Sequence, residues 1–406
     1  MRTRRAAGRF LRVLTIPLVL AGALTGLVPA GASAATCQSW TGTQPPDPGT
    51  SSNILNGITV LSACNAWAVG LQSDGRIATT LIEHWNGASW TVVPSPSPGT
   101  TESELQAIRA RSATDIWAVG FSDVTSSTSE TGSADQTLIE HWDGHTWKVM
   151  PSPDPGTVNN QLFGVRTVSA SDAWAVGFTS DGTVNLAGNR ALILHWNGTK
   201  WASVATPSLG TGVVGSQLLG VAATSGTNAW AVGTTYRGSG SSLRTASLIL
   251  RWNGTKWARV ASPSPAPGSG LSGVGVTSAG NAWAVGAVGR LERPSQTFIL
   301  HWNGRAWARV PSPSPGGSPH FDFLNSVTAV SASDVWAVGT VFTESQGDQS
   351  LALHWNGRSW QQVMAPKVAD EDQFTAVAAS SARNVWMAGF TVPTAAPFQV
   401  IAFHCC

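Results

Sequence analysis

Twenty tryptophans occupy three recurring positions in this chain, and that regularity limits its fold more than any other feature. The first position is the Trp of the motif W-A-V-G, which becomes W-M-A-G in the last copy. The second is the Trp of H-W-N-G or a close variant, and the third follows that Asn-Gly pair by three residues. A large side chain recurs in this way when one structural unit has been copied along the chain. The three sets are Trp67, Trp117, Trp174, Trp230, Trp283, Trp336 and Trp386; Trp85, Trp142, Trp196, Trp252, Trp302 and Trp355; and Trp40, Trp90, Trp147, Trp201, Trp257, Trp307 and Trp360.

The repeat predicts an all-β fold. Successive W-A-V-G tryptophans are 50, 57, 56, 53, 53 and 50 residues apart, and repeats of similar length with several short strands are typical of propeller blades. In the third copy, residues 162–168, 173–178, 191–196 and 201–205 are predicted as four strands, and Asn197-Gly198 is a hairpin signal between the last two. We therefore predict a seven-bladed β-propeller with four-stranded blades over residues 36–406.

The connections within the repeat fall into two groups. The turn between the first and second strands always has Ser five residues before the Trp and Asp or Asn two residues before it. We expect the Asp or Asn side chain to cap this turn by accepting hydrogen bonds from backbone N–H groups. The connections between blades, and those between the second and third strands, vary in length and content. In a propeller these variable loops share one face, where we expect the binding site.

The two ends of the mature chain are predicted to complete one blade. Residues 37–40 align with residues 87–90 at the start of a fourth strand, and residues 400–406 align with a third strand. The last blade would then take its outer strand from the N-terminus, and this closure leaves no unpaired strand edge.

The same alignment brings the four cysteines to one face. We predict that Cys37 pairs with Cys405 or Cys406 and that Cys64 pairs with the remaining one. A vicinal Cys405–Cys406 bond is the least favoured of the three possible pairings. Because the chain has no C-x-x-C motif, we expect a structural role for these bonds rather than a redox one.

Residues 1–35 have the parts of a secretory signal peptide. Arginines precede an apolar stretch at 13–28, and Ala32-Ser33-Ala34 matches an A-x-A cleavage site. We expect removal of this segment and a secreted, extracellular protein that is a monomer or part of a secreted assembly. No later run of about 18 apolar residues predicts a membrane span. Residues 1–35 carry five of the 24 Lys and Arg and none of the 22 Asp and Glu, so the remainder has a formal net charge of −3. Without a basic run, a nucleic-acid partner is not expected.

The histidines invite a metal hypothesis, which their spacing disfavours. One His per blade around a ring cannot converge on one ion, so we expect packing or hydrogen bonding and predict no metal and no cofactor. His145 and His320 break the pattern but do not make a site by themselves. The repeat slot is filled by His84, His141, His195, His301, His354 and His404, with Arg251 in the remaining copy.

The tryptophans allow two interpretations. Buried indoles would hold neighbouring blades together, whereas exposed ones would stack on sugar rings. Burial is expected for the W-A-V-G set, which lies in a second strand. For the two sets that flank the Asn-Gly turn, packing is favoured and repeated sugar sites remain the alternative.

The repeat resembles the kelch family of β-propellers over residues 37–406. Kelch units have an apolar second strand ending in Gly-Gly, then a Tyr, then a Trp. Here the second strand ends in Ala-Val-Gly, a His-Trp pair stands near the Tyr position, and a second Trp follows. The chain departs from the family in having a single Gly and only one Tyr, Tyr236. The resemblance implies a divergent, Trp-rich secreted kelch-like architecture and no particular activity.

Enzymatic chemistry is the alternative to a binding role. A copper site like that of galactose oxidase needs two Tyr residues, which this chain lacks. Arg109 and Arg166 share one innermost-strand slot in adjacent blades, but a sialidase-like site would also need a Tyr nucleophile, so local contacts are favoured. Glycoside hydrolysis needs two carboxylates at a defined separation. Candidates on the variable loops are Glu102, Glu104, Asp181, Glu292, Asp322, Glu344, Asp348, Asp370, Glu371 and Asp372.

We interpret the chain as a secreted binding or scaffold propeller that engages a protein or a cell-surface glycan through its variable-loop face. The alternative is a glycan-active hydrolase or lyase with a carboxylate site at the channel mouth. The loops that depart most from the repeat are 121–137, 178–191, 234–247, 287–297 and 316–325. Within them the predicted ligand-binding residues are Arg190, Tyr236, Arg237, Arg244, Arg290, Arg293, His320, Phe321 and Phe323.

Overall fold

The structure is a computed structural model that describes residues 40–125, 133–182, 186, 188–265, 268–289, 295–317, 320–343, 347–369, 371–393 and 397–405. The chain divides into two units, Met1–Ser33 and Ala34–Cys406. The signal-peptide prediction therefore lies outside the described residues, as do the predictions for Cys37, Arg290, Glu292, Arg293, Glu344, Asp370 and Cys406.

The unit Ala34–Cys406 is built from antiparallel sheets whose strands pair in chain order. The first four sheets are β1 (Ser52–Ser62), β2 (Asn65–Ser73), β3 (Ala78–Trp85) and β4 (Trp90–Val92); β5 (Ser103–Ser112), β6 (Asp115–Thr125), β7 (Ser133–Trp142) and β8 (Trp147–Val149); β9 (Asn159–Ser169), β10 (Asp172–Ser180), β11 (Arg190–Trp196) and β12 (Trp201–Ser203); β13 (Val213–Ser225), β14 (Asn228–Arg237), β15 (Arg244–Trp252) and β16 (Trp257–Arg259), with a 3-10 helix η1 (Gly240–Ser242) before β15.

The rest of the unit repeats this pattern with two variations. One parallel pair, Ser295 with Phe321, joins two four-strand groups into an eight-stranded sheet, and the last sheet has three strands. The groups are β17 (Ser269–Ser278), β18 (Asn281–Gly289), β19 (Ser295–Trp302) and β20 (Trp307–Val310); β21 (Phe321–Ser331), β22 (Asp334–Thr343), β23 (Gly347–Trp355) and β24 (Trp360–Val363); and β25 (Asp372–Ser381), β26 (Asn384–Thr391) and β27 (Gln399–Cys405).

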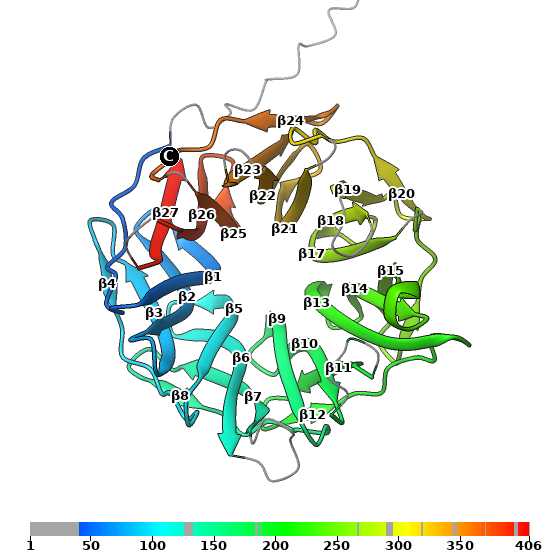
Figure 1. Ribbon diagram of the computed structural model, residues 1–406, viewed down its shortest axis with the longest axis horizontal. Coiled ribbons are helices and arrows are strands. Elements are labelled where there is room, and N and C mark those ends of the chain that lie inside the picture. The colour runs from blue at the N-terminus through cyan, green and yellow to red at the C-terminus, as the bar shows by residue number, and fades with distance from the viewer. Residues whose placement is uncertain are drawn as a thin grey trace, which may run out of the picture. The chain divides into compact units, whose positions relative to one another are not determined.

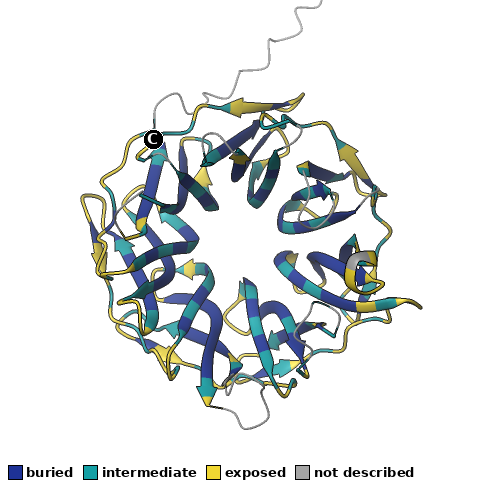
Figure 2. Ribbon diagram, viewed as in Figure 1, coloured by how far each residue is buried: buried dark blue, intermediate teal, exposed yellow. Residues whose placement is uncertain are grey.

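Within this unit the sheets stand radially around a central opening (Figure 1). The first strand of each group lies next to the opening, and the short fourth strand lies at the rim. Burial follows the same order, because the inner and middle strands are largely buried and the rim is largely exposed (Figure 2). The core is therefore divided among the spaces between sheets rather than collected in one centre.

Three indoles fill the space between neighbouring sheets. Trp67 stacks on His84 at 4.2 Å and contacts Trp142 and Trp147 of the next sheet at 5.1 and 5.9 Å between ring centroids. The W-A-V-G indoles are 4 % exposed or less, whereas Trp142, Trp252 and Trp355 of the second set are half-buried. Burial is therefore confirmed for the W-A-V-G set, and the other two sets also pack between neighbouring sheets. The sugar-stacking alternative stays a prediction for the partly exposed indoles of the second set.

The described chain ends meet in the last sheet. The N–H of Thr41 donates to the carbonyl oxygen of His404 at 2.9 Å, and the N–H of His404 donates back at 2.8 Å. Trp40 packs edge-on against Trp336 at 5.6 Å, which is the place that a third-position Trp occupies between other sheets. On the other side of this sheet, Trp386 contacts Trp85 of the first sheet at 5.6 Å.

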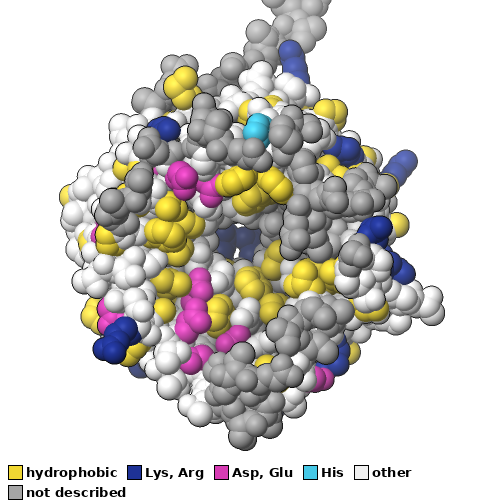
Figure 3. Space-filling model, viewed as in Figure 1, with side chains coloured by type: hydrophobic (Ala, Val, Ile, Leu, Met, Phe, Trp, Pro, Cys, Tyr) yellow, Lys and Arg dark blue, Asp and Glu magenta, His cyan; other side chains and the backbone are white. Residues whose placement is uncertain are grey.

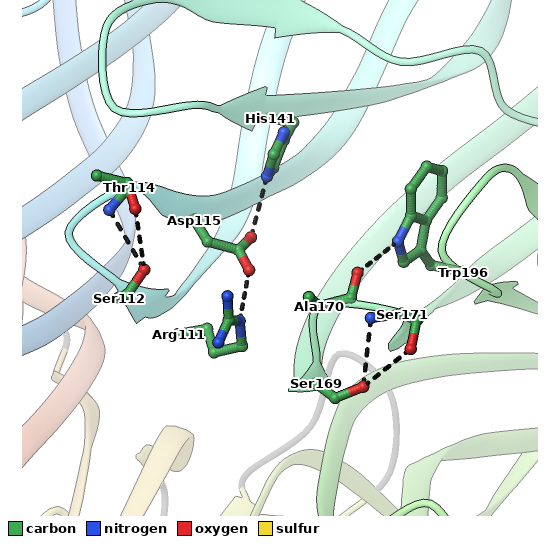
Figure 4. A network of polar contacts seen from close by, with 9 residues as sticks. All are labelled: Arg111, Ser112, Thr114, Asp115, His141, Ser169, Ala170, Ser171 and Trp196. Atoms are coloured by element: carbon green, nitrogen blue, oxygen red, sulfur yellow. Dashed lines mark hydrogen bonds and ion pairs between the residues drawn. The ribbon is translucent and has the colours of Figure 1, made fainter.

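The turns between first and second strands form one face of the unit, which we call the turn face. Asp115 accepts hydrogen bonds from His141 at 2.9 Å and from Arg111 at 2.5 Å (Figure 4). The Asx side chain therefore bonds the repeat His rather than the turn backbone, and the predicted Asx cap is wrong. The Ser of the repeat performs that role instead, as when Ser112 accepts the N–H of Thr114. Five of the repeat histidines are thus held by one hydrogen bond and one indole, namely His84, His141, His195, His301 and His354.

In the first, second, fourth and fifth groups, a serine in the proline segment after the fourth strand lies within hydrogen-bond distance of a hydroxyl of the third strand. Ser95 and Ser97, in the run Pro94–Pro98, lie 2.7 and 2.9 Å from the hydroxyl of Thr80. Ser312 repeats the contact with Thr297 at 2.8 Å. The prolines themselves cannot donate, and the serines between them satisfy the edge of the sheet.

Cys64 is a free, exposed cysteine, so its predicted disulfide is wrong. It occupies the turn slot that holds Thr114 and Ser171 in the next two copies, and in each copy this residue packs on the Gly of the Asn-Gly turn. A Cβ built on Gly87 would lie 3.1 Å from the Cys64 sulfur. Cys405 is buried and is not a free thiol. Among the described residues, no helix is long and apolar enough to cross a membrane.

Candidate functional site

A cavity of about 180 Å³ occupies the central opening. It is lined by three consecutive residues from each of the inner strands β1, β5, β9, β13, β17, β21 and β25. Each inner strand has a register shift at this point, for example between Leu55 and Gly57 in β1. The bulge turns a side chain toward the axis, because the extra residue falls outside the regular pairing.

Small residues allow the inner strands to converge around this cavity. A Cβ added to Gly57 would lie 3.0 Å from the Cα of Ala107, and one added to Gly220 would lie 3.0 Å from the carbonyl oxygen of Ser272. Both distances are shorter than ordinary side-chain contacts. The bulge residues, such as Asn56 and Phe163, therefore decide the chemistry of the cavity wall.

The opposite face carries the variable connections, and we call it the loop face. Figure 3 shows this face, on which acidic side chains gather at one side of the central opening over β5 to β7. Hydrophobic side chains gather at another side over β21 and β22. These two groups flank the mouth of the cavity.

The acidic group consists of Glu102 and Glu104 at the start of β5, Asp123 near the end of β6, and Asp135 near the start of β7. Asn56 of the first sheet donates to Glu104 at 2.7 Å. Gln161 of the third sheet donates to Asp135. Amides from both neighbouring sheets thus hold the carboxylates of the second sheet at the mouth.

Burial and mutual repulsion change how these carboxyls titrate. Burial raises the pKa of Glu104 to about 7, against the hydrogen bond from Asn56 and with help from Glu102. The pKa values of Glu102 and Asp135 are also raised, first by burial and then by neighbouring carboxylates. Burial acts in the same direction on Asp123, but bonds from Thr101 and Glu102 outweigh it and lower the pKa. Near neutral pH, a partly protonated Glu104 therefore lies in the same group as an ionised Asp123.

The hydrophobic group is an aromatic ledge made by Phe321 and Phe323 of β21 and Phe342 of β22. Phe321 and Phe342 are register partners whose rings meet edge-on at 6.0 Å, and Phe342 is 39 % exposed. His320 directly precedes this strand. Exposed aromatic rings on a polar face are typical of binding surfaces.

A second acidic pair borders the ledge. Asp348 of β23 is the register partner of Phe342, and its pKa is raised by burial and then by Glu371. Gln373 of β25 donates to Asp348, in the same repeat positions as Gln161 and Asp135. The mouth thus has carboxylates on both sides of the opening.

The predicted ligand-binding residues are only partly brought together. Phe321 and Phe323 belong to the aromatic ledge, and His320 directly precedes it. Tyr236 is 3 % exposed, and burial raises its pKa to about 12, so its surface is not presented to a ligand.

The predicted arginines of the described residues lie apart from the ledge. Arg190 pairs with Asp181, and Arg237 donates to the carbonyl oxygen of Thr211 at 2.7 Å. Arg244 begins β15 and donates to the carbonyl oxygen of Leu243 at 3.1 Å.

The remaining candidate carboxylates have structural tasks. Asp322 is fully buried and accepts the hydroxyl of Ser314 at 2.5 Å. Asp372 is also buried and accepts the N–H of Val368 at 2.8 Å. Among the described residues, no group of three or more His, Cys, Asp or Glu side chains is arranged to hold a metal ion.

Sequence reasoning missed Asn56, Asp123, Asp135, Gln161 and Phe342. One signal could have found part of this set. The slot before the buried Leu or Phe of each inner strand faces the mouth, and its occupants differ between copies. They are Ile54, Glu104, Gln161, Gln217, Gly270, Phe323 and Gln373.

No known protein family matches the sequence, and no curated protein matches it significantly. Solved structures do resemble the fold. An ulvan lyase of polysaccharide lyase family PL25 aligns with a TM-score of 0.55 and 9 % identity, covering 89 % of this chain and 95 % of that one. YCF48 bound to a D1 peptide aligns with a TM-score of 0.50 and 14 % identity, covering 90 % and 96 %. The GH74 xyloglucanase of Xanthomonas campestris aligns with a TM-score of 0.51 and 14 % identity, covering 89 % and 55 %.

These likenesses show the fold, which is that of a β-propeller. They do not show membership of the kelch family. The neighbours include glycan-active enzymes and a peptide-binding protein. The likeness of fold therefore does not distinguish a binding protein from an enzyme.

Proposed function

We propose that the chain is a secreted, seven-bladed binding propeller that engages a protein segment rich in Lys and Arg at the mouth of its loop face. The single observation that carries this proposal is the carboxylate group of Glu102, Glu104, Asp123 and Asp135, placed across the opening from an exposed aromatic ledge. Clustered negative charge attracts cationic partners and speeds their encounter. The ledge supplies an apolar surface for a neighbouring side chain.

The blade number and closure in this proposal have specific support. Inner strands β1, β5, β9, β13, β17, β21 and β25 each contribute to one cavity lining. The pairing of Thr41 with His404 gives the three-stranded last sheet an outer neighbour. Cys37 is close in sequence to Thr41, and we propose that it bonds Cys405 to lock the closure.

Export is proposed from the sequence of residues 1–35. Expression of the full chain in a secreting bacterial host tests it by mass measurement of the protein in the medium. Cleavage after Ala34 or Ala35 would support the proposal, whereas an intact, cell-retained chain would contradict it. Intact mass with and without reduction would reveal the disulfide, since oxidation removes about two mass units.

The binding proposal is tested with a displayed library of random twelve-residue peptides. We expect enriched sequences to contain Lys or Arg beside an apolar residue, and their synthetic peptides to bind more weakly as salt rises. The variant Glu102→Gln/Glu104→Gln should weaken binding at least about tenfold, because it removes charge from the mouth. Asp143→Asn on the turn face is the matched control and should bind like the parent. Equal loss in both variants, or no enrichment, would sink the proposal.

A second candidate function is cleavage of a glycan at the same mouth. The contrast between Glu104, whose pKa is raised to about 7, and Asp123, whose pKa is lowered, favours it, because acid and base roles need carboxyls that titrate apart. Reducing-end release and absorbance of new double bonds, measured on a panel of neutral and acidic polysaccharides, test this candidate. Turnover abolished by Glu104→Gln, with Asp143→Asn unaffected, would establish it. No turnover on any substrate would leave binding as the function.

A further inference from the structure

Two arginines lie at the turn-face end of the central cavity. Arg109 of β5 and Arg166 of β9 occupy the same position on adjacent inner strands, where the other copies hold only small residues. The residues directly before them, Ile108 and Val165, line the cavity. Basic side chains are visible deep in the central opening when the unit is viewed from the loop face (Figure 3). The corresponding small residues are Thr59, Ala222, Gly275, Thr328 and Ala378.

These two guanidinium groups lack a countercharge among the described residues. Arg166 donates from one Nη to the carbonyl oxygen of Ala223 at 3.0 Å, but its buried Nε has no partner in the described part of the chain. Arg109 forms no hydrogen bond or ion pair with a described residue. Other arginines differ, since Arg111 has Asp115 and Arg190 has Asp181.

The pair is electrostatically unfavourable as it stands. Burial, and then the charge of Arg166, lower the pKa of Arg109. A guanidinium nevertheless keeps its proton in a protein. A shielded positive charge without a partner is costly. An anion with two or more oxygens would relieve that cost, because the planar fork of Arg matches such groups in two-pronged hydrogen bonds.

We propose that Arg109 and Arg166 together bind one small oxyanion, a carboxylate, sulfate or phosphate group, at the turn-face end of the cavity. The site is independent of the loop-face proposal, because it lies at the opposite end of the opening. Acidic groups at one end and basic groups at the other would make the cavity polar along its axis.

Equilibrium dialysis of the full chain against radiolabelled sulfate, inorganic phosphate and acetate, at constant ionic strength, tests the site. We expect saturable binding of about one ion per chain. Tighter binding of sulfate and phosphate would identify a tetrahedral oxyanion, and tighter binding of acetate would identify a carboxylate. Absence of saturable binding for all three would overturn the proposal without any variant.

The double variant Arg109→Gln/Arg166→Gln should lose this binding, and Arg305→Gln, which changes an exposed turn-face arginine, should retain it. Arg109→Lys keeps the charge and removes the fork, so its affinity should fall at least about tenfold even if the double variant does not fold. Unchanged affinity in Arg109→Lys and in the double variant would place the ion elsewhere and contradict the assignment.

Discussion

On the turn face the same hydrogen bonds recur from sheet to sheet, whereas on the loop face neighbouring sheets carry different side chains. His141 bonds Asp115 and His354 bonds Asp334, both at 2.9 Å. At the mouth, by contrast, one inner-strand slot holds Glu104 in the second sheet and Phe323 in the sixth group. The residues shared by all copies therefore maintain the fold, and the residues that differ between copies determine the chemistry of the mouth.

The largest loss of stability is expected when an indole buried between neighbouring sheets is removed. Trp230 is fully buried and contacts Trp302 and Trp307 of the next group at 5.0 and 5.1 Å. We expect Trp230→Ala to lower the free energy of unfolding by about 3–5 kcal/mol. Denaturation in urea measures the change. Phe342→Ala, on the exposed ledge, is the comparison and should cost less than about 1 kcal/mol. A reversed order would break the contrast between the shared residues and the mouth.

Two glutamates occupy positions in the hydrophobic core between the sheets. Glu83 and Glu140 occupy the core slot that holds Leu194 in the third sheet, and both are 0 % exposed with no hydrogen-bond partner in the described part of the chain. Burial raises the pKa of Glu83 to about 9, with a smaller contribution from Asp47, and that of Glu140 to about 8. Both side chains are therefore protonated in the folded protein at neutral pH.

The raised pKa values give stability a definite pH dependence. Below about pH 4.5 both carboxyls are protonated in the folded and unfolded states, so they cost no ionisation energy. As the pH rises toward 8–9, only the unfolded state ionises, and the free energy of unfolding falls. Glu83→Leu/Glu140→Leu should stabilise the protein by about 1–3 kcal/mol per residue at pH 8 and should flatten this decline. Thermal melts of parent and variant from pH 5 to 9 measure it, and parallel pH profiles would contradict it.

The Asn-Gly turns of the turn face should not tolerate a side chain at their glycine. Gly198 in the Asn-Gly turn has a φ of +95°, and an added Cβ would lie 2.8 Å from the Cβ of Ser171. Gly198→Ala should therefore destabilise the protein by about 1–3 kcal/mol. Gly210→Ala, at φ +88° with no atom within 4 Å of the new Cβ, is the matched control for strain without a clash. If urea denaturation shows the same loss of unfolding free energy for both variants, the effect comes from the positive φ alone and not from the clash with Ser171.

The smallest effect is expected at Cys64. Because Ser and Thr fill this slot in other copies, Cys64→Ser should change the free energy of unfolding by less than about 0.5 kcal/mol. A thiol reagent should label Cys64 in the native parent, and peptide mapping of the variant should show one labelled position fewer. Loss of a disulfide on substitution, or a native protein without a reactive thiol, would restore the pairing that the structure contradicts.

Much of the repeated sheet structure was predictable because the same sequence motif occurs in every copy of the repeat. The strands, the Asn-Gly turns and the burial of the tryptophans were all expected. Two repeat-level details were not. The Asx residue bonds a His some twenty positions away in sequence, as Asp334 does with His354. Cys64 replaces the Ser or Thr of other copies at one position of the repeat and does not form a disulfide.

The mouth was predictable only in part. Phe321 and Phe323 were recognised because they stand in a variable loop. Asn56 and Glu104 are 48 residues apart, and their meeting depends on how adjacent sheets pack at the axis, which one copy of the repeat does not encode. Tyr236 was misjudged because position in a variable loop does not distinguish a buried from an exposed side chain.

Hydrogen–deuterium exchange of the full chain, with and without a peptide selected from the displayed library, tests most directly whether binding lies in the departures from the repeat. The account predicts slower exchange at residues 101–106 and 321–324, at the loop-face ends of β5 and β21. It predicts no change in the turns at residues 62–65 and 112–115. Protection confined to those turns would contradict it.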